Sequence, residues 1–128
     1  MTIRMTTPGR PARAERGAVT AELAMGLPLL VAMTIGLVWL LSVGAAQIRT
    51  VDAARETVRA VARGDDVGEA VARGRRVAPA GAEVSVSRGG GQVVATSSAR
   101  VEGPGGLFGF LPEVTVRAEA VAADEEPE

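Results

Sequence analysis

The longest hydrophobic run of the chain lies between Glu22 and Arg49, where no residue is charged. An α-helix rises ~1.5 Å per residue and needs ~20 mainly apolar residues to cross the hydrocarbon core of a bilayer. The stretch 23–48 is long enough, and Trp39 lies toward its far end, where an indole suits the membrane interface. The pattern therefore predicts one transmembrane helix. A buried core helix is the alternative, but so short a chain offers little to wrap it.

Helical periodicity continues beyond the apolar run. Apolar residues recur at spacings of three and four and form one stripe, which comprises Ile48, Val51, Ala54, Val58 and either Val61 or Ala62. Gly64 is a typical helix stop. Asp66 can cap a second, short helix, with Glu69 three residues later, and Pro79 ends it. We therefore expect the first helix to extend past the membrane as a stalk, followed by a second helix.

After Pro79 the apolar residues alternate with polar ones, as is typical of strands with one buried face. Gly89–Gly91 predicts a turn between the first two of three such segments, which would pack on the stalk as an antiparallel sheet. Their apolar positions are Val84 and Val86, then Val93, Ala95, Ala99 and Val101, then Val114, Val116, Ala118 and Ala120. The expected fold class is α+β, with a long N-terminal transmembrane helix continuing as a stalk, a second short helix, and a small three-stranded sheet packed on the stalk.

The connection from Gly103 to Pro112 contains both phenylalanines of the chain, in the segment Leu107-Phe108-Gly109-Phe110-Leu111. Because so small a sheet needs large side chains, we expect this segment to plug the core of the head. A subunit or membrane contact is the alternative. The expected organisation is a basic leader over 1–17, a transmembrane and assembly helix over 18–48, an exported α+β head over 49–122 and an acidic, disordered tail over 123–128.

Charge is distributed unevenly, although the formal net charge is only −1. The segment 1–17 holds four arginines and one glutamate, whereas acidic residues outnumber arginines after the apolar run. A basic segment directly before a span favours a cytoplasmic N-terminus and an extracellular C-terminus, as in a single-pass cell-membrane protein. The layout is typical of targeting, so we expect membrane lipid as a partner and no nucleic acid.

The chain contains no cysteine, histidine or lysine. Thiolate and imidazole metal ligands, thiol nucleophiles and a histidine base are therefore excluded, and a lysine-containing phosphate loop cannot be completed. The serines lack a base that would activate them. We expect no enzymatic activity, no catalytic residue, no cofactor and no metal.

A processing pattern stands at the start of the apolar run. Gly17 follows charged residues, and four residues separate it from a lone acid, Glu22, at the head of the span. This pattern resembles a type III (prepilin) signal, in which a membrane-embedded aspartyl peptidase cuts directly after the glycine and the hydrophobic segment is kept. Two alternatives stay open: a conventional signal peptide cut near Ala45, where small residues precede Ala46, and an unprocessed single-pass membrane protein.

The wider sequence carries a closer resemblance. Arg16-Gly17-Ala18-Val19-Thr20-Ala21-Glu22-Leu23-Ala24, followed by Leu27-Pro28-Leu29-Leu30, resembles the TadE-like family of minor pilins and pseudopilins. Gln47-Ile48-Arg49-Thr50-Val51-Asp52-Ala53-Ala54-Arg55 is similar to the helix continuation of actinobacterial members. The resemblance implies a part in a tight-adherence (Flp) type IV pilus system, either in the pilus or in secretion or assembly machinery. The implied partners are a prepilin peptidase, other pilin subunits and an inner-membrane assembly platform.

The same resemblance gives roles to individual residues. Cleavage would fall between Gly17 and Ala18, the processing site, and would create a new amine on Ala18. A carboxylate at the edge of hydrocarbon needs a partner. The assembly role implied for Glu22 is to pair with the Ala18 amine of a neighbouring subunit and to fix the axial register between subunits. Pro28 removes one helix hydrogen bond and predicts a kink, with a tolerated membrane proline as the alternative.

Overall fold

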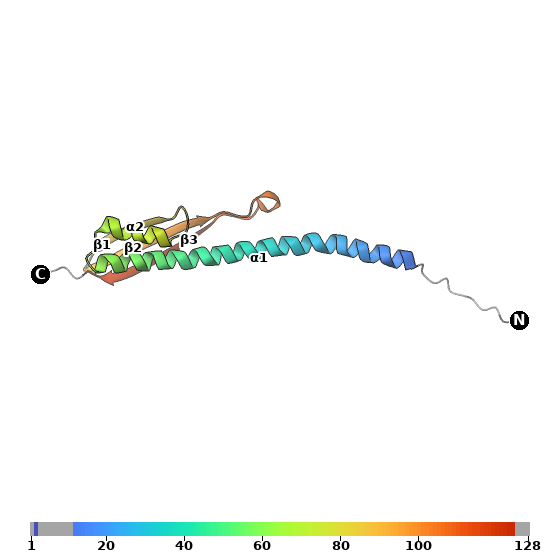
Figure 1. Ribbon diagram of the computed structural model, residues 1–128, viewed down its shortest axis with the longest axis horizontal. Coiled ribbons are helices and arrows are strands. Elements are labelled where there is room, and N and C mark those ends of the chain that lie inside the picture. The colour runs from blue at the N-terminus through green and yellow to red at the C-terminus, as the bar shows by residue number, and fades with distance from the viewer. Residues whose placement is uncertain (1, 3–11, 125–128) are drawn as a thin grey trace. The chain divides into compact units, whose positions relative to one another are not determined.

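The computed structural model describes Thr2 and residues 12–124 of the chain. Its elements follow the order α1 (Ala12–Ala62), α2 (Val67–Val77), β1 (Glu83–Gly89), β2 (Gln92–Val101), the 3-10 helix η1 (Gly106–Phe108) and β3 (Val114–Ala123) (Figure 1). Contacts divide the chain into two units, Met1–Gly36 and Leu37–Glu128. The expected α+β class, with a long apolar N-terminal helix, a short second helix and a three-stranded antiparallel sheet, is confirmed.

The long helix α1 ends where the sequence predicts. Gly64 has a φ of 90°, which costs a glycine little because it has no Cβ. The N–H of Gly64 donates to the carbonyl of Val61 at 2.9 Å, and the N–H of Asp65 donates to the carbonyl of Ala60 at 3.1 Å. This pair of bonds is a Schellman motif, so the last carbonyls of α1 are satisfied before the chain turns toward α2.

The second helix begins at the predicted cap. The carboxylate of Asp66 accepts hydrogen bonds from the N–H groups of Gly68 and Glu69, at 2.8 and 3.2 Å. The neighbouring acid, Asp65, has a different role. Its carboxylate lies 3.1 Å from the guanidinium of Arg73 on α2. One acid therefore starts the helix, and the other is paired with an arginine further along it.

Removing the cap gives a first testable prediction. Asp66→Ala should lower the free energy of unfolding by about 0.5–2 kcal/mol, because two N–H groups of α2 lose their acceptor. Asp66→Asn should retain most of the stability, since an amide oxygen can accept the same bonds. The measurement is denaturant unfolding of the full chain in detergent, followed by the emission of Trp39. If the two variants lost the same stability, the charge of Asp66, and not its hydrogen bonds to the start of α2, would account for the loss.

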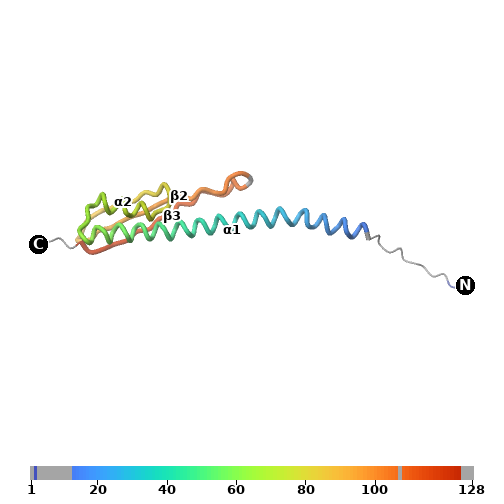
Figure 2. Tube along the Cα trace, viewed as in Figure 1, coloured from blue at the N-terminus to red at the C-terminus, as the bar shows by residue number. Residues whose placement is uncertain are grey.

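The three strands form one antiparallel sheet in the order β1-β2-β3. The turn between β1 and β2 contains Gly90 and Gly91, which have φ values of 61° and 73°. Two successive left-handed residues match the twist of the flanking strands in a tight hairpin. Register is defined by pairs such as Val86 with Ala95, and Ala95 in turn with Ala120. Figure 2 shows the three strands side by side along the Cα trace.

The sheet packs on the second half of α1, as expected. Near the end of α1, Val58 and Val61 share a cluster with Val93 and Ala95 of β2. Closer to its middle, Ala46 shares a second cluster with residues of β2 and β3. The largest fully buried side chains are valine, threonine and serine. Such small side chains bury little apolar area in the sheet alone, so the head depends on α1 for its core.

The buried stripe of α1 differs from the predicted one. Ile48 was assigned to the stripe, but 65% of its surface is exposed. Thr50 and Thr57 are fully buried instead, and their hydroxyls donate to the carbonyls of Ala46 and Ala53 at 2.8 Å each. A hydroxyl satisfied four residues back along the helix can be buried without losing a hydrogen bond. Counting only apolar residues therefore missed these two positions.

The expectation for the β2–β3 connection is also wrong. Phe110 was expected to plug the core of the head, but it is 78% exposed. Phe108 is only partly buried, and its ring centroid lies 6.2 Å from that of Phe110. The small residues of the strands approach α1 closely enough to close the core without a large aromatic plug.

Two predicted segments are only partly described. Residues 1 and 3–11 of the expected leader and residues 125–128 of the expected tail lie outside the described residues. In the tail, Ala123 is the last residue of β3. The N–H of Asp124 donates to the carbonyl of Gly91 at 2.9 Å, and its carboxylate lies 4.0 Å from the guanidinium of Arg88. The start of the acidic segment is thus attached to the sheet.

Candidate functional site

The uncharged part of α1 is the most distinctive surface of the protein. Of the residues that the structure describes, one helix, Arg13–Ala62, is long and apolar enough to cross a membrane. Only 6% of its most apolar 18-residue window is buried inside the protein. Met25, Leu29 and Leu41 are 80%, 72% and 73% exposed. A core helix would be covered by its own chain, so the exposure argues against that alternative and fits a helix surrounded by lipid or by other subunits.

The residues of the predicted processing and assembly site lie near the start of α1. Gly17, Ala18 and Glu22 are all helical and exposed. Within the described part of the chain, no ion pair includes Glu22. The Glu22 carboxylate is therefore exposed, and no described cation is paired with it. Its predicted pairing with the Ala18 amine of a neighbouring subunit stays a prediction, because a single chain does not test it.

Pro28 lies inside α1, and the helix continues through it. A proline has no N–H to donate, so the carbonyl of Ala24, four residues earlier, loses its usual partner. Gly26 lies between them, and nothing lies within 4 Å of the position that a Cβ would take on it. The predicted kink stays a prediction. The freed carbonyl at Ala24 is the local feature that would allow this part of the helix to bend.

Among the described residues, side-chain hydrogen bonds of Trp39 and Gln47 connect α1 to the β2 and β3 region, and sequence reasoning predicted neither bond. The indole Nε1 of Trp39 donates to the carbonyl of Glu102 at 3.1 Å. The amide Nε2 of Gln47 donates to the carbonyl of Arg117 at 3.2 Å. Trp39 was assigned to the membrane interface on residue type alone. It also holds the end of β2 against α1, so the head is docked at the level of the last third of the uncharged run.

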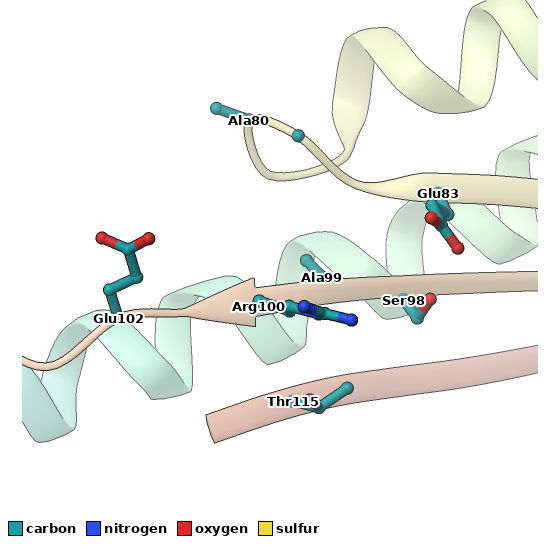
Figure 3. Close-up of a pocket in the computed structure, with 8 residues that line it drawn as sticks. Ala80, Glu83, Ser98, Ala99, Arg100, Glu102 and Thr115 are labelled. Atoms are coloured by element: carbon teal, nitrogen blue, oxygen red, sulfur yellow. The ribbon is translucent and has the colours of Figure 1, made fainter. Parts of the chain in front are cut away.

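The head has a shallow depression of ≈ 380 Å³ at the ends of the strands (Figure 3). Its charged residues are Glu83, Arg100 and Glu102, and the guanidinium of Arg100 lies 3.8 Å from the carboxylate of Glu113. Ser98 and Thr115 contribute hydroxyls, and Ser98 pairs across the strands with Glu83. Among the described residues, no cluster of acidic side chains could hold a metal ion.

These features define a class of protein, namely one in which a helix able to span a membrane leads into a small α+β head. Within that class, a family model described as TadE-like protein matches residues 17–59. All of the matched residues lie in α1, from the glycine of the predicted processing site to the part of the helix on which the sheet packs. The TadE-like resemblance read from the sequence is therefore confirmed for this segment.

A curated relative extends the likeness into the head. The chain is similar to a protein of Mycobacterium tuberculosis (strain ATCC 25618 / H37Rv) described as apoptosis inhibitor Rv3655c, at 39% identity over 79 residues. The match covers 62% of this chain and 57% of the relative. The chain thus spans a little over half the length of the relative that it matches. No solved structure matches the chain.

Proposed function

We propose that this chain is a minor pilin or pseudopilin of a tight-adherence type IV pilus system. A prepilin peptidase cuts it after Gly17, and α1 then assembles with other subunits on an inner-membrane platform. The observation that carries the proposal is the position of Glu22. It is a lone acid at the head of an uncharged and exposed helix, inside the TadE-like match. The role is structural and involves no enzymatic reaction.

The charge of Glu22 gives the proposal its mechanism. A carboxylate held at the edge of hydrocarbon loses hydration, which is costly unless an opposite charge is near. Cleavage after Gly17 frees the amine of Ala18, whose ordinary pKa of ~7.7–8.0 leaves it largely protonated at neutral pH. In a packed bundle, the amine of one subunit meets the carboxylate of the next. The pair fixes the axial offset between helices, because only one register neutralises both charges.

The local structure around Gly17 supports access for a peptidase. A scissile peptide must leave the helix to enter an active site. Gly17 lies close to the start of α1, where helices open locally at little cost. A glycine within a helix is also less stable than an alanine by roughly 0.5–1 kcal/mol. Among the described residues, nothing lies within 4 Å of the position that a Cβ would take on Gly17, so none of them packs against this face of the helix.

The proposed topology places the N-terminus in the cytoplasm and the head outside the cell membrane. The arginines before the span support this orientation. In this arrangement membrane lipid surrounds α1 until neighbouring subunits replace it. The apolar side chains from Leu23 to Leu41 that are exposed in the single chain are then covered in both states.

A second candidate is an exported binding protein cut near Ala45 by a conventional signal peptidase. The observation that favours it is the name of the mycobacterial relative, an apoptosis inhibitor. The contacts of two residues, Ala46 and Trp39, support retention of the span instead. Ala46 is buried in one cluster with Ala99 and Val116, directly after the alternative cut. Trp39, which that cut would remove, donates to Glu102.

N-terminal sequencing of the chain recovered from its own cells tests the proposal. We expect the mature chain to begin at Ala18. A chain that begins at Ala46 would support the exported binding protein, and one that retains Met1–Gly17 would support an unprocessed membrane protein. The sample must come from both the membrane fraction and sheared surface material, because unassembled and assembled subunits separate between them.

A further inference from the structure

The β2–β3 connection carries an exposed apolar tip that the proposed pilin role does not use. No charged residue lies between Glu102 and Glu113. Phe110 is 78% exposed and contacts the partly buried Phe108, with ring centroids 6.2 Å apart. An exposed aromatic pair on a small head costs hydration free energy unless another surface covers it.

The packing of β2 on α1 shows where this tip is directed. Val93, early in β2, shares a cluster with Val58 and Val61, whereas Ala99 shares one with Ala46. The carbonyl of Glu102, just past the strand, accepts from Trp39. The strand therefore runs along α1 toward lower residue numbers, away from the charged part of the helix. Beyond Glu102, the chain continues as the loop that Figure 1 shows extending past the end of the sheet.

The helix surface at this level is apolar as well. Leu37, Leu40 and Leu41 are 51%, 60% and 73% exposed. They belong to the same uncharged run that the membrane proposal places in hydrocarbon. Trp39 lies among them, and indoles concentrate at the boundary between headgroups and acyl chains. The docking bond to Glu102 thus sets the base of the loop at the expected height of the outer membrane interface.

The backbone of the tip is suited to an apolar environment. Gly105 and Gly106 have φ values of 70° and 58°, which allow the chain to turn tightly into η1. The N–H groups of Phe108, Gly109 and Leu111 donate to carbonyls within the loop, at 3.0, 3.1 and 2.9 Å. Unsatisfied backbone groups are the main cost of placing an irregular segment in lipid. Here several of them are already paired.

The geometry points to a second membrane contact: the 103–112 loop inserts Phe108 and Phe110 into the outer interface beside α1. The inference rests on the membrane-spanning role proposed for α1. With α1 anchored across the membrane and the loop anchored in the outer interface, the head cannot rotate freely about the helix axis. One face of the head therefore stays toward the lipid. Glu102 and Glu113, which flank the loop, remain at the headgroup level, and Glu113 is also close to Arg100.

Lipid fits this tip better than a second copy of the chain does. The loop contains no cation that would seek an anionic partner, and its most exposed described large side chain is the aromatic Phe110. Its height coincides with exposed leucines of α1 that lipid must cover while the subunit is in the membrane. Insertion should therefore occur in neutral phosphatidylcholine bilayers and should not weaken with salt, since no charge contributes to it.

The chain contains no cysteine, so single nitroxide labels can be placed without a background. We would label Phe110→Cys in the full chain, reconstituted in phosphatidylcholine vesicles, and measure collision with oxygen and with a water-soluble nickel chelate. Phe110 is exposed, so the substitution should leave the fold intact. Ser87→Cys, on the exposed side of β1 near its turn to β2, is the aqueous control, and Leu30→Cys in the uncharged part of α1 is the membrane control.

We expect the Phe110 label to lie ~5–10 Å below the headgroup level, oxygen-rich and shielded from nickel, while the Ser87 label stays in water. A Phe110 label as accessible to nickel as the Ser87 label would overturn the loop contact. If the Leu30 label remained buried in that case, the spanning helix would still stand. A label shielded from both reagents and broadened by a nearby spin would overturn the lipid contact in favour of a second copy. A water-accessible Leu30 label would overturn the span and the loop contact together.

Discussion

A chain that carries Gly17→Asp is expected to keep residues 1–17 and to remain in the membrane, outside any filament. In the proposed cleavage, the peptidase must bring its catalytic groups close to the backbone at residue 17. Glycine allows that approach because it has no Cβ. Aspartate adds both a side chain and a negative charge at the scissile carbonyl. We expect mature product to fall below detection, measured as the intact mass of the chain from membranes and from sheared surface material.

Glu22→Gln is the matched control for that experiment. It leaves the residues at the cut unchanged, so the chain should still be cut after Gly17. Without the carboxylate, the amine of Ala18 on a neighbouring subunit loses its counter-charge, and incorporation should fall strongly. A Gly17→Asp chain that matures normally would exclude cleavage at this position. A Glu22→Gln chain that assembles as well as the native one would show that the pairing does not set the register.

The long-range periodic patterns were the part of the fold that the sequence predicted well. The uncharged run and the spacing that follows it predict α1, because each residue contributes to the same helical repeat. The alternation of apolar and polar residues likewise predicts the strands. Val84, Val93 and Val116 are all buried, as expected. A repeat over many residues tolerates single exceptions, so the elements and their order were predictable.

Individual positions were less predictable where a polar group satisfies itself locally. Thr50 and Thr57 are buried because each donates to a carbonyl in its own helix, and that bond is invisible to a count of apolar residues. Ser97 is also fully buried, at the inward position of β2 that the predicted alternation left empty, although its hydroxyl has no hydrogen-bond partner among the described residues. Phe110 shows the reverse case. Its residue type predicts burial, but whether the core has room depends on how closely α1 approaches the sheet.

The residues of the candidate site were predicted from the sequence, but their positions relative to their binding partners were not. Gly17, Ala18 and Glu22 lie on one exposed stretch of helix, and the proposed counter-charge belongs to another subunit. A single chain can show that the carboxylate faces outward, whereas the pairing exists only in the assembly. The bond from Trp39 to Glu102 lay beyond sequence reasoning, because it joins residues 63 positions apart through a backbone carbonyl.

The closest packing in the head suggests a second variant with a large effect. Gly74 of α2 is buried against α1. A Cβ added at this position would overlap the hydroxyl of Thr57 and would lie 3.1 Å from the carbonyl of Ala53 and 3.3 Å from Cγ1 of Val84. Gly74→Val must therefore push α2 away from α1 or displace the hydroxyl from its bond to Ala53. Overpacking of this kind costs about 1–3 kcal/mol, and a β-branched residue against backbone belongs at the upper end.

That loss should be visible as a lower unfolding midpoint of the full chain in detergent, followed by the emission of its one tryptophan, Trp39. Ala72→Val is the matched control, because Ala72 is exposed on the same helix and should change stability by less than about 0.5 kcal/mol. Gly74→Ala separates two opposing effects. Helix propensity alone would stabilise it by about 1 kcal/mol, so a net loss identifies the steric contact.

Thr57→Ala provides the decisive comparison, because it removes the atom that the new Cβ meets first. Thr57→Ala alone should destabilise the head, since it leaves a small cavity beside a glycine. Combined with Gly74→Ala, the added methyl group occupies the space that the hydroxyl vacated. The double variant should be more stable than the sum of the two single changes predicts, by roughly 0.5–3 kcal/mol of coupling. Strict additivity would mean that α2 and α1 do not meet at these residues, and the docking of α2 would have to be sought elsewhere on the helix.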